Sequence, residues 1–453
     1  MGKKALLFTL LVSVLAIFLG STQAESEILY IFGKEGAGDF ENEYLRRNDP
    51  DFEWTGVEAA EGNNDAKYLA MQMQTKNDCF DVYAAGYAYC GLTRLNEKGF
   101  CMDLSCFPEL AEISGKYHPF IQQAIRSEGK LFAIPIGISV SGWGYNRYIA
   151  EEMGLQESMP STYSELFSML AWWLEEGSDL YPEYELLVGP ESFKTALCSK
   201  VIHDYVNYCT LAGIKMDFED EIITKLIREL DELDTDELDR REAMAADGIA
   251  YNKPSLLIMD CNYADLNGNG TAGLVPLKIG VTEDDTVIIA DIYCFALNPN
   301  TSRPEMAATY ISTFMENMDE EERIMLFCDE SVQPIENPEY ADDIEYNSMI
   351  RQSLLDNTRI DHDERERLLY ENEKERQLIE ASRWYISREQ IDLYFQLTKK
   401  MAVRCQNILE RNSANGTLEI QNDINRYGKG EISSNQFLRS ANQVLQMIIG
   451  EGE

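Results

Sequence analysis

Residues 129–146 read GKLFAIPIGISVSGWGYN, a run of apolar and small residues that contains Pro135. Proline cannot donate a hydrogen bond to a neighbouring strand, so it suits an edge strand or a segment that crosses between structural units. Residues 286–297 form a second apolar segment that predicts a crossing strand. We therefore expect the chain to pass from one unit to another near residue 140 and to return near residue 290.

The residues before the first crossing predict an α/β unit. Residues 28–32 are typical of a strand, residues 65–75 of a helix and residues 80–83 of a second strand. Strands that alternate with helices at this spacing favour a parallel sheet. Amphipathic helices are predicted after residue 140, where Thr162 and Glu165 form a capping-box pattern at the start of one helix.

The C-terminal part of the chain is predicted to be helical. Residues 361–380 are dominated by charged side chains, which indicates a solvated helix. The fold class that follows is α/β, with two lobes that form a clamshell. We expect lobe one to comprise residues 25–140 plus 295–345, and lobe two to comprise residues 141–294 plus 346–453 with the C-terminal helices. A cleft between two such lobes is a preferred small-molecule site.

The N-terminus resembles a secretory signal peptide over residues 1–24. Lys3 and Lys4 precede an apolar run at residues 5–19, and Ala24 supplies a small residue for cleavage. An uncleaved membrane anchor is the alternative, but the run is shorter than the roughly 20 residues of a spanning helix. We expect an exported protein that acts at the cell surface, outside the cell or in a periplasm.

The composition argues against nucleic acid and anionic membranes as partners, and it does not decide whether disulfides form. The formal net charge of −40 disfavours nucleic acid and anionic membranes as partners. We expect a soluble monomer. The ten cysteines include no CxxC pair, and most lie in apolar stretches that suit buried thiols. Cys101 with Cys106, or Cys90 with one of them, are the close candidates for a bridge.

Catalytic and metal-binding patterns are scarce. The chain has three histidines, no HExxH spacing and no GxSxG motif, and we predict no catalytic residues and no cofactor. A glycosidase pair among the many carboxylates is not excluded by counting. Residues 265–270 fit the first half of a calcium loop, but Pro276 occupies the position of its last ligand. We therefore predict no metal site.

Several segments together resemble the extracellular solute-binding proteins of carbohydrate-type ABC importers (family 1, with the maltodextrin-binding fold). Each is a weak signal alone, but their order and spacing match; they are residues 79–83, 98–105, 129–135, 144–147, 160–166, 296–308 and 427–433. The resemblance implies the type II fold of periplasmic binding proteins. Residues 19–22 lack the lipobox cysteine found in many Gram-positive members.

The resemblance also implies where a solute would bind. Loops after the first strands of lobe one and the start of lobe two line the cleft in that family. The corresponding residues here are Glu35, Gly36, Gly86, Tyr87, Trp143 and Tyr145. We expect the indole of Trp143 to be accessible because glycines flank it, and aromatic faces suit sugars. The alternative for Trp143 is an aromatic residue packed in the core.

The function that the resemblance implies is the capture of a small solute without chemistry. We expect a sugar or oligosaccharide to bind in the cleft, the lobes to close, and the closed form to dock on a membrane ABC permease. Two alternatives remain: an exported adhesion or sensor-input module on the same fold, and a glycan-degrading enzyme.

Overall fold

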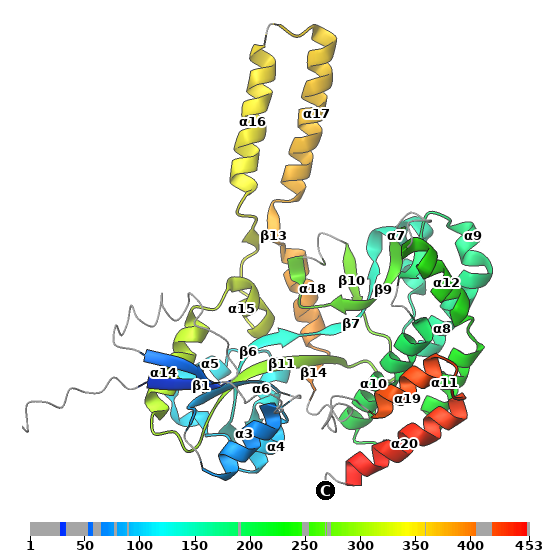
Figure 1. The fold of residues 1–453 in the computed structure, drawn as a ribbon. Helices are drawn as coiled ribbons and strands as arrows, with labels where there is room; N and C mark the ends of the chain where they lie inside the picture. Colours follow the sequence, from blue (N-terminus) through cyan, green and yellow to red (C-terminus); the bar gives the residue numbers. More distant parts are fainter. Residues whose placement is uncertain are drawn as a thin grey trace, which may run out of the picture.

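The structure is a computed structural model that describes residues 28–32, 53–57, 65–76, 79–87, 90–188, 192–246, 253–267, 269, 273–357, 359–404 and 419–450. Two lobes lie side by side, and a pair of long helices extends away from both of them (Figure 1). Each lobe has its own hydrophobic core. The predicted two-lobe α/β fold is confirmed.

The chain passes between the two cores near the predicted positions. Val140 packs in the core of lobe one, whereas Trp143 packs in the core of lobe two. The chain returns between Val281 of lobe two and Ile288 of lobe one. A third passage, between Val403 and the segment that begins at Glu419, was not predicted.

Two of the predicted lobe bounds are therefore wrong. Residues 288–294 belong to lobe one, because their strand continues through the sheet of that lobe. Residues 386–403 also pack in lobe one, although the sequence placed them in lobe two. The long-range strand pairing that returns this segment to lobe one has no signature in its local sequence.

Lobe one is built from three stretches of the chain. Its elements are β1 (Ile28–Phe32), β2 (Glu53–Val57), α3 (Asp65–Gln74), β3 (Val82–Gly86), α4 (Leu92–Glu97), η2 (Leu104–Cys106), α5 (Pro108–Ser114), α6 (Pro119–Ala124), β4 (Arg126–Ser127), β5 (Lys130–Leu131), β6 (Ile134–Ser139), β11 (Ile288–Leu297), α14 (Pro304–Glu316), α15 (Glu320–Leu326), α18 (Arg388–Thr398) and β14 (Met401–Val403).

The sheet of lobe one is mixed, not purely parallel as predicted. Its order is β14-β11-β3-β1-β2, with β6 also paired to β11. The β1 strand is parallel to β2 and β3, whereas β11 runs antiparallel to β3 and β6. Pro135 lies in β6, which pairs with β11 alone among the described strands, and such an edge position suits a residue without an N–H.

Lobe two follows the first crossing and is completed by the C-terminal helices. Its elements are β7 (Ser141–Asn146), α7 (Arg147–Met153), η3 (Gln156–Ser158), α8 (Tyr163–Trp172), η4 (Trp173–Gly177), α9 (Ser178–Leu180), β8 (Glu185–Val188), α10 (Phe193–Ala212), α11 (Glu221–Glu232), α12 (Thr235–Ala246), β9 (Ser255–Asn262), β10 (Leu274–Leu277), α19 (Glu419–Gly428) and α20 (Ser434–Gly450). Its sheet has the order β10-β7-β9-β8.

Local capping residues explain where several helices begin. The Thr162 hydroxyl accepts a hydrogen bond from the backbone N–H of Glu165 at 3.3 Å, as the sequence predicted. The carboxylate of Glu165, however, accepts from Ser161, one residue earlier than a capping box requires. Ser387 and Gln390 form a complete capping box at α18.

The two projecting helices form an antiparallel hairpin that belongs to neither core. They are α16 (Tyr340–Asp356) and α17 (His362–Ala381), and the short strands β12 (Ile335–Glu336) and β13 (Trp384–Ile386) pair at their base (Figure 1). The predicted solvated helix is α17. Between the helices, Asn347 and Asn372 are buried and each donates a side-chain N–H to the backbone carbonyl of the other at 3.1 Å.

The nine described cysteines are all free thiols, so no disulfide is present among them. Cys90 and Cys294 are buried in lobe one, where small thiols pack like apolar residues. In the described part of the chain, no helix has both the length and the apolar character needed to cross a membrane. The predicted signal peptide, residues 1–24, lies outside the described residues.

Candidate functional site

Trp143 lies in the core of lobe two, where its side chain is 2% exposed. The expectation of an accessible indole is therefore wrong, and the alternative of a packed aromatic is correct. The flanking glycines have another role. A Cβ at Gly144 would lie 2.8 Å from Cys261 Cβ, and a Cβ at Gly142 would collide with the ring of Tyr263. The glycines thus let neighbouring side chains approach the backbone of β7 closely.

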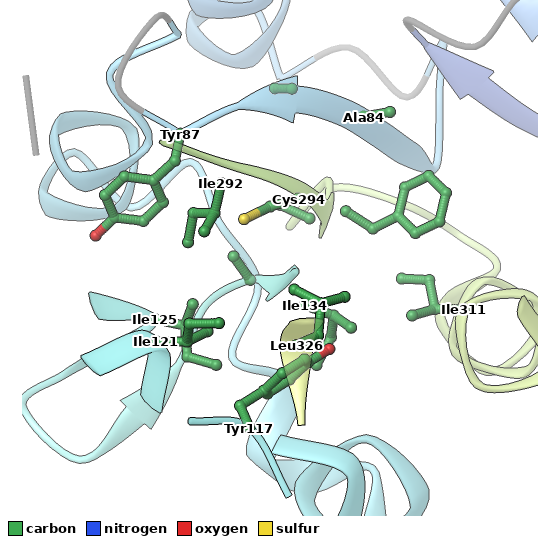
Figure 2. Close-up of a cluster of buried hydrophobic side chains, with 14 of the residues drawn as sticks. Ala84, Tyr87, Tyr117, Ile121, Ile125, Ile134, Ile292, Cys294, Ile311 and Leu326 are labelled. Carbon is green, nitrogen blue, oxygen red and sulfur yellow. The ribbon is translucent and has the colours of Figure 1, made fainter. Parts of the chain in front are cut away.

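Tyr87 is also a core residue, with 2% of its surface exposed. Figure 2 shows its ring beside Ile292 in the core of lobe one. Its hydroxyl donates a 2.5 Å hydrogen bond to the carbonyl of Ala124 and accepts one from Thr93 at 3.1 Å. A ring that is buried and hydrogen-bonded in this way is not available to a solute, so the expected contact at Tyr87 is not supported.

Gly86 and Tyr145 lie in strands of the two lobes. Gly86 ends β3 and pairs with Tyr293, and Tyr145 is partly buried against the core of lobe two. Contact of Gly86 and Tyr145 with a solute stays a prediction. Glu35 and Gly36 lie outside the described residues.

A polar recess lies where the two lobes meet. Its volume is about 620 Å³, and we call it the interlobe recess. Lobe two provides Ser141 at the start of β7, three residues of β9 and one face of α10, while lobe one provides Arg404 directly after β14. The lining residues are Ser141, Ala196, Ser199, Lys200, His203, Asp204, Asn207, Ile258, Met259, Asp260 and Arg404.

The spacing of residues on α10 accounts for the polar wall of the recess. Lys200, His203, Asp204 and Asn207 recur at intervals of three and four residues, which places them on one side of a helix. The opposite side of α10 carries the apolar residues Leu197, Val201, Ile202, Tyr205 and Val206, which are buried in the core. The sequence predicted this amphipathic helix but not that its polar side faces the other lobe.

A chain of hydrogen bonds joins this wall to the core. The indole N–H of Trp143 donates to the hydroxyl of Tyr163 at 3.4 Å, and that hydroxyl donates to Asp204 Oδ2 at 2.6 Å. Tyr163 is completely buried, and burial raises its pKa well above the ordinary value, with the Asp204 charge as the next cause. The tyrosine therefore stays protonated and holds the carboxylate of Asp204 in place. Trp143 therefore acts on the recess indirectly, through its hydrogen bond to Tyr163.

The charges around the recess are of both signs. Lys200 Nζ lies 2.9 Å from Asp260 Oδ1, and Arg404 Nε lies 3.4 Å from Asp291 Oδ1. Burial lowers the pKa of His203 to about 4, so its imidazole is neutral at pH 7. Burial raises the pKa of Asp291, although Arg404 opposes that shift. The recess thus offers cationic donors, anionic acceptors and a neutral imidazole, a set that suits a polar ligand without net charge.

Over the residues that the structure describes, no group of three or more histidine, cysteine, aspartate or glutamate side chains is placed to hold a metal ion. Leu266 and Asn269, in the segment considered for calcium, instead border a separate pocket near the base of the helical hairpin.

Comparisons with known proteins bear on the fold. No protein-family model and no curated protein sequence matches this chain. Solved structures do match over almost the full length. A protein from Synechococcus sp. MITs9220, described as an oligosaccharide periplasmic-binding protein, has a TM-score of 0.55 at 15% identity, with 93% of this chain and 99% of that chain covered.

Two ligand-binding proteins match with similar coverage. Maltose-bound MalE3 of T. maritima has a TM-score of 0.52 at 12% identity, with 93% of this chain and 99% of that chain covered. The GacH receptor of Streptomyces glaucescens, solved with acarbose, has a TM-score of 0.52 at 11% identity, with 93% and 98% covered. At such identities the likeness establishes architecture only. The chain has the two-lobed α/β fold of the type II periplasmic binding proteins.

Proposed function

We propose that this protein captures a neutral sugar or oligosaccharide outside the cytoplasm and delivers it to an ABC importer. The observation that carries the proposal is the interlobe recess, in which the polar face of α10 on lobe two opposes Arg404 on lobe one. Both lobes must contribute to the ligand site if binding is to close them. Two domains that close about a hinge when a ligand binds between them are an established case in which binding changes the conformation of a protein.

The chemistry of the recess suits saccharide hydroxyl groups. A hydroxyl both donates and accepts hydrogen bonds, so it can donate to Asp204 while it accepts from Lys200 or Arg404. Hydrogen bonds to charged groups contribute roughly 1.5–3 kcal/mol each, more than neutral ones. The matching structures support this class of ligand, since they include an oligosaccharide periplasmic-binding protein and proteins with bound maltose and acarbose.

Delivery of the solute depends on its different affinities for the open and closed forms of the protein. A solute that contacts both lobes binds the closed form more tightly than the open form, and it shifts the population by that difference. A permease that recognises the closed form would then receive loaded protein.

We infer that the chain is exported through residues 1–24, and mass spectrometry of the exported form should find a new N-terminus near Glu25. A retained Met1 would contradict cleavage.

Isothermal titration calorimetry against monosaccharides, oligosaccharides, amino acids and polyamines tests the proposal. We expect a saccharide to bind, and Asp204→Ala to weaken that binding by about 10- to 100-fold, the scale of a lost charged hydrogen bond. Asp179→Ala is the matched control, because Asp179 is an exposed acid of the same lobe that does not line the recess. Its affinity should equal that of the wild type.

The calorimetric screen, followed by analysis of the recovered ligand, tests for a polyamine ligand and for the glycan-degrading enzyme. Binding of polyamines alone would contradict a neutral ligand and would make the −40 charge relevant to function. Chromatography of the bound saccharide after prolonged incubation should recover it intact. Shortened products would instead support the glycan-degrading enzyme.

A further inference from the structure

A second pocket lies at the base of the helical hairpin. Its volume is about 430 Å³, within the range of about 300–1,000 Å³ that is typical of small-molecule sites. We call it the hairpin-base pocket. None of its lining residues lines the interlobe recess. We propose that the hairpin-base pocket is a second binding site, for one or two rings of a neutral saccharide.

The pocket has walls from both lobes and from the hairpin. Arg147 and Tyr148 at the start of α7, together with β10, form the wall of lobe two. Glu389 and Gln390 of α18 belong to the wall of lobe one. The third wall is β13, with Trp384 and Tyr385 at the foot of α17. A ligand here would touch three parts of the protein at once.

Exposed aromatic side chains concentrate at this pocket. Tyr148 is 53% exposed, Trp384 is 40% exposed and Tyr385 is 37% exposed. The other exposed aromatic residues of the described chain, Tyr293, Tyr346 and Tyr370, lie elsewhere and do not share a pocket with them. Single exposed apolar residues need no explanation, but three aromatic rings around one cavity offer the flat apolar surfaces on which sugar C–H groups pack.

Two of these rings are held in place by arginines. The guanidinium carbon of Arg383 lies 4.8 Å from the ring centre of Trp384, and that of Arg147 lies 5.0 Å from the ring centre of Tyr148. The Tyr148 ring also contacts the backbone at Gly273, where a Cβ would collide with it. Because these rings are already oriented, little side-chain entropy is lost when a ligand packs against them.

The polar groups of the pocket point to a ligand without net charge. Arg147 Nη1 lies 3.2 Å from Glu389 Oε1, so the cation and the anion offset each other. Arg147 Nη2 donates a hydrogen bond to the hydroxyl of Tyr148 at 3.1 Å, so the cation is tied to an aromatic residue of the same wall. Side-chain amides and hydroxyls complete the lining, among them Asn337, Ser382 and Gln390. Rings, amides and a balanced ion pair together match a saccharide better than an ionic solute.

Calorimetry on the full chain with Asp204→Ala tests this site, because that variant weakens binding at the interlobe recess by about 10- to 100-fold and leaves the hairpin-base pocket unchanged. The probes are glucose, maltose, maltotriose, cellobiose and xylobiose. We expect at least one to bind the Asp204→Ala protein with a stoichiometry of one. Adding Trp384→Ala or Tyr148→Ala should weaken that binding by about tenfold or more. Tyr346→Ala removes an exposed aromatic outside the pocket and should change nothing.

The outcomes for the two sites are distinguishable. If the wild type binds a saccharide and Asp204→Ala abolishes all binding, the hairpin-base pocket is not a saccharide site, while the proposed function stands. Residual binding that is insensitive to both Trp384→Ala and Tyr148→Ala also overturns the inference. Binding that only those two variants weaken supports the pocket even if the interlobe recess proves to bind another solute.

Discussion

The hydroxyl of Tyr163 donates a 2.6 Å hydrogen bond to Asp204 Oδ2, and this bond connects the core of lobe two to the interlobe recess. Tyr163 is completely buried, whereas Asp204 lines the recess. A buried side chain that is fixed by packing thus determines the direction of a carboxylate that we propose contacts the solute. Binding residues held in this way are preorganised, which reduces the cost of ordering them when a ligand binds.

Tyr163→Phe should weaken saccharide binding without unfolding the protein. The substitution leaves the ring in place but removes the donor to Asp204, so we expect a loss of about 0.5–1.5 kcal/mol, or roughly two- to tenfold in affinity. Calorimetry measures it. Tyr205→Phe is the control, since Tyr205 is a buried tyrosine of the same lobe whose hydroxyl donates to the carbonyl of Asp217. Equal affinities for the two variants would show that the Tyr163 bond does not position the ligand site.

Trp143→Ala should destabilise the fold. Removing a large buried aromatic side chain leaves a cavity, and such substitutions reduce the free energy of unfolding by about 3–5 kcal/mol. Urea unfolding measures this loss. Trp384→Ala provides the comparison, because its partly exposed side chain lies outside both cores and should change stability by about 0.5 kcal/mol or less. Unchanged stability of Trp143→Ala would contradict the placement of this residue in the core.

His118 should make the protein less stable in acid. Burial lowers the pKa of its imidazole to about 4, and the side chain packs near the rings of Phe120, Tyr394 and Phe395. The unfolded chain, in which the pKa is about 6.5, binds more protons between pH 6.5 and pH 4. Stability from this group is therefore complete above pH 6.5 and is lost as the pH falls towards 4.

The His118→Phe variant measures this contribution. Between pH 6.5 and pH 4, the wild type should lose about 3 kcal/mol more of its unfolding free energy than the variant does. Urea titrations at several pH values give both curves. His362→Phe is the control, since His362 is exposed at the start of α17. Parallel curves for the wild type and His118→Phe would show that His118 titrates normally in the folded protein.

Replacing the asparagine pair of the hairpin should stabilise it. The side-chain carbonyls of Asn347 and Asn372 are buried without a hydrogen-bond partner, although their amide N–H groups are satisfied. A buried unpaired acceptor costs about 1–3 kcal/mol, so Asn347→Leu with Asn372→Leu should slow hydrogen exchange of the hairpin amides. Gln352→Leu on the exposed side of α16 should have no such effect. Faster exchange in the double variant would mean that the amides stabilise the pairing of the helices.

Local sequence signals determined the elements of this protein and the order of its lobes. The strand at residues 28–32, the amphipathic helices after residue 140 and the capping residue Thr162 were each predicted from neighbouring residues. Pro135 in the apolar segment 129–146 also indicated the first crossing. These features depend on backbone geometry and periodicity within about ten residues, and such information is present in the local sequence.

The tertiary structure alone decided which side chains line the recess. Trp143 between two glycines had the local pattern of an accessible ring, yet Tyr163 of α8 packs against its indole and Tyr263, directly after β9, donates a hydrogen bond to its backbone carbonyl. Arg404 reaches the recess because β14 returns to pair with β11 more than one hundred residues earlier. Burial and the approach of one lobe to the other depend on contacts between residues far apart in the chain, and no short segment encodes them.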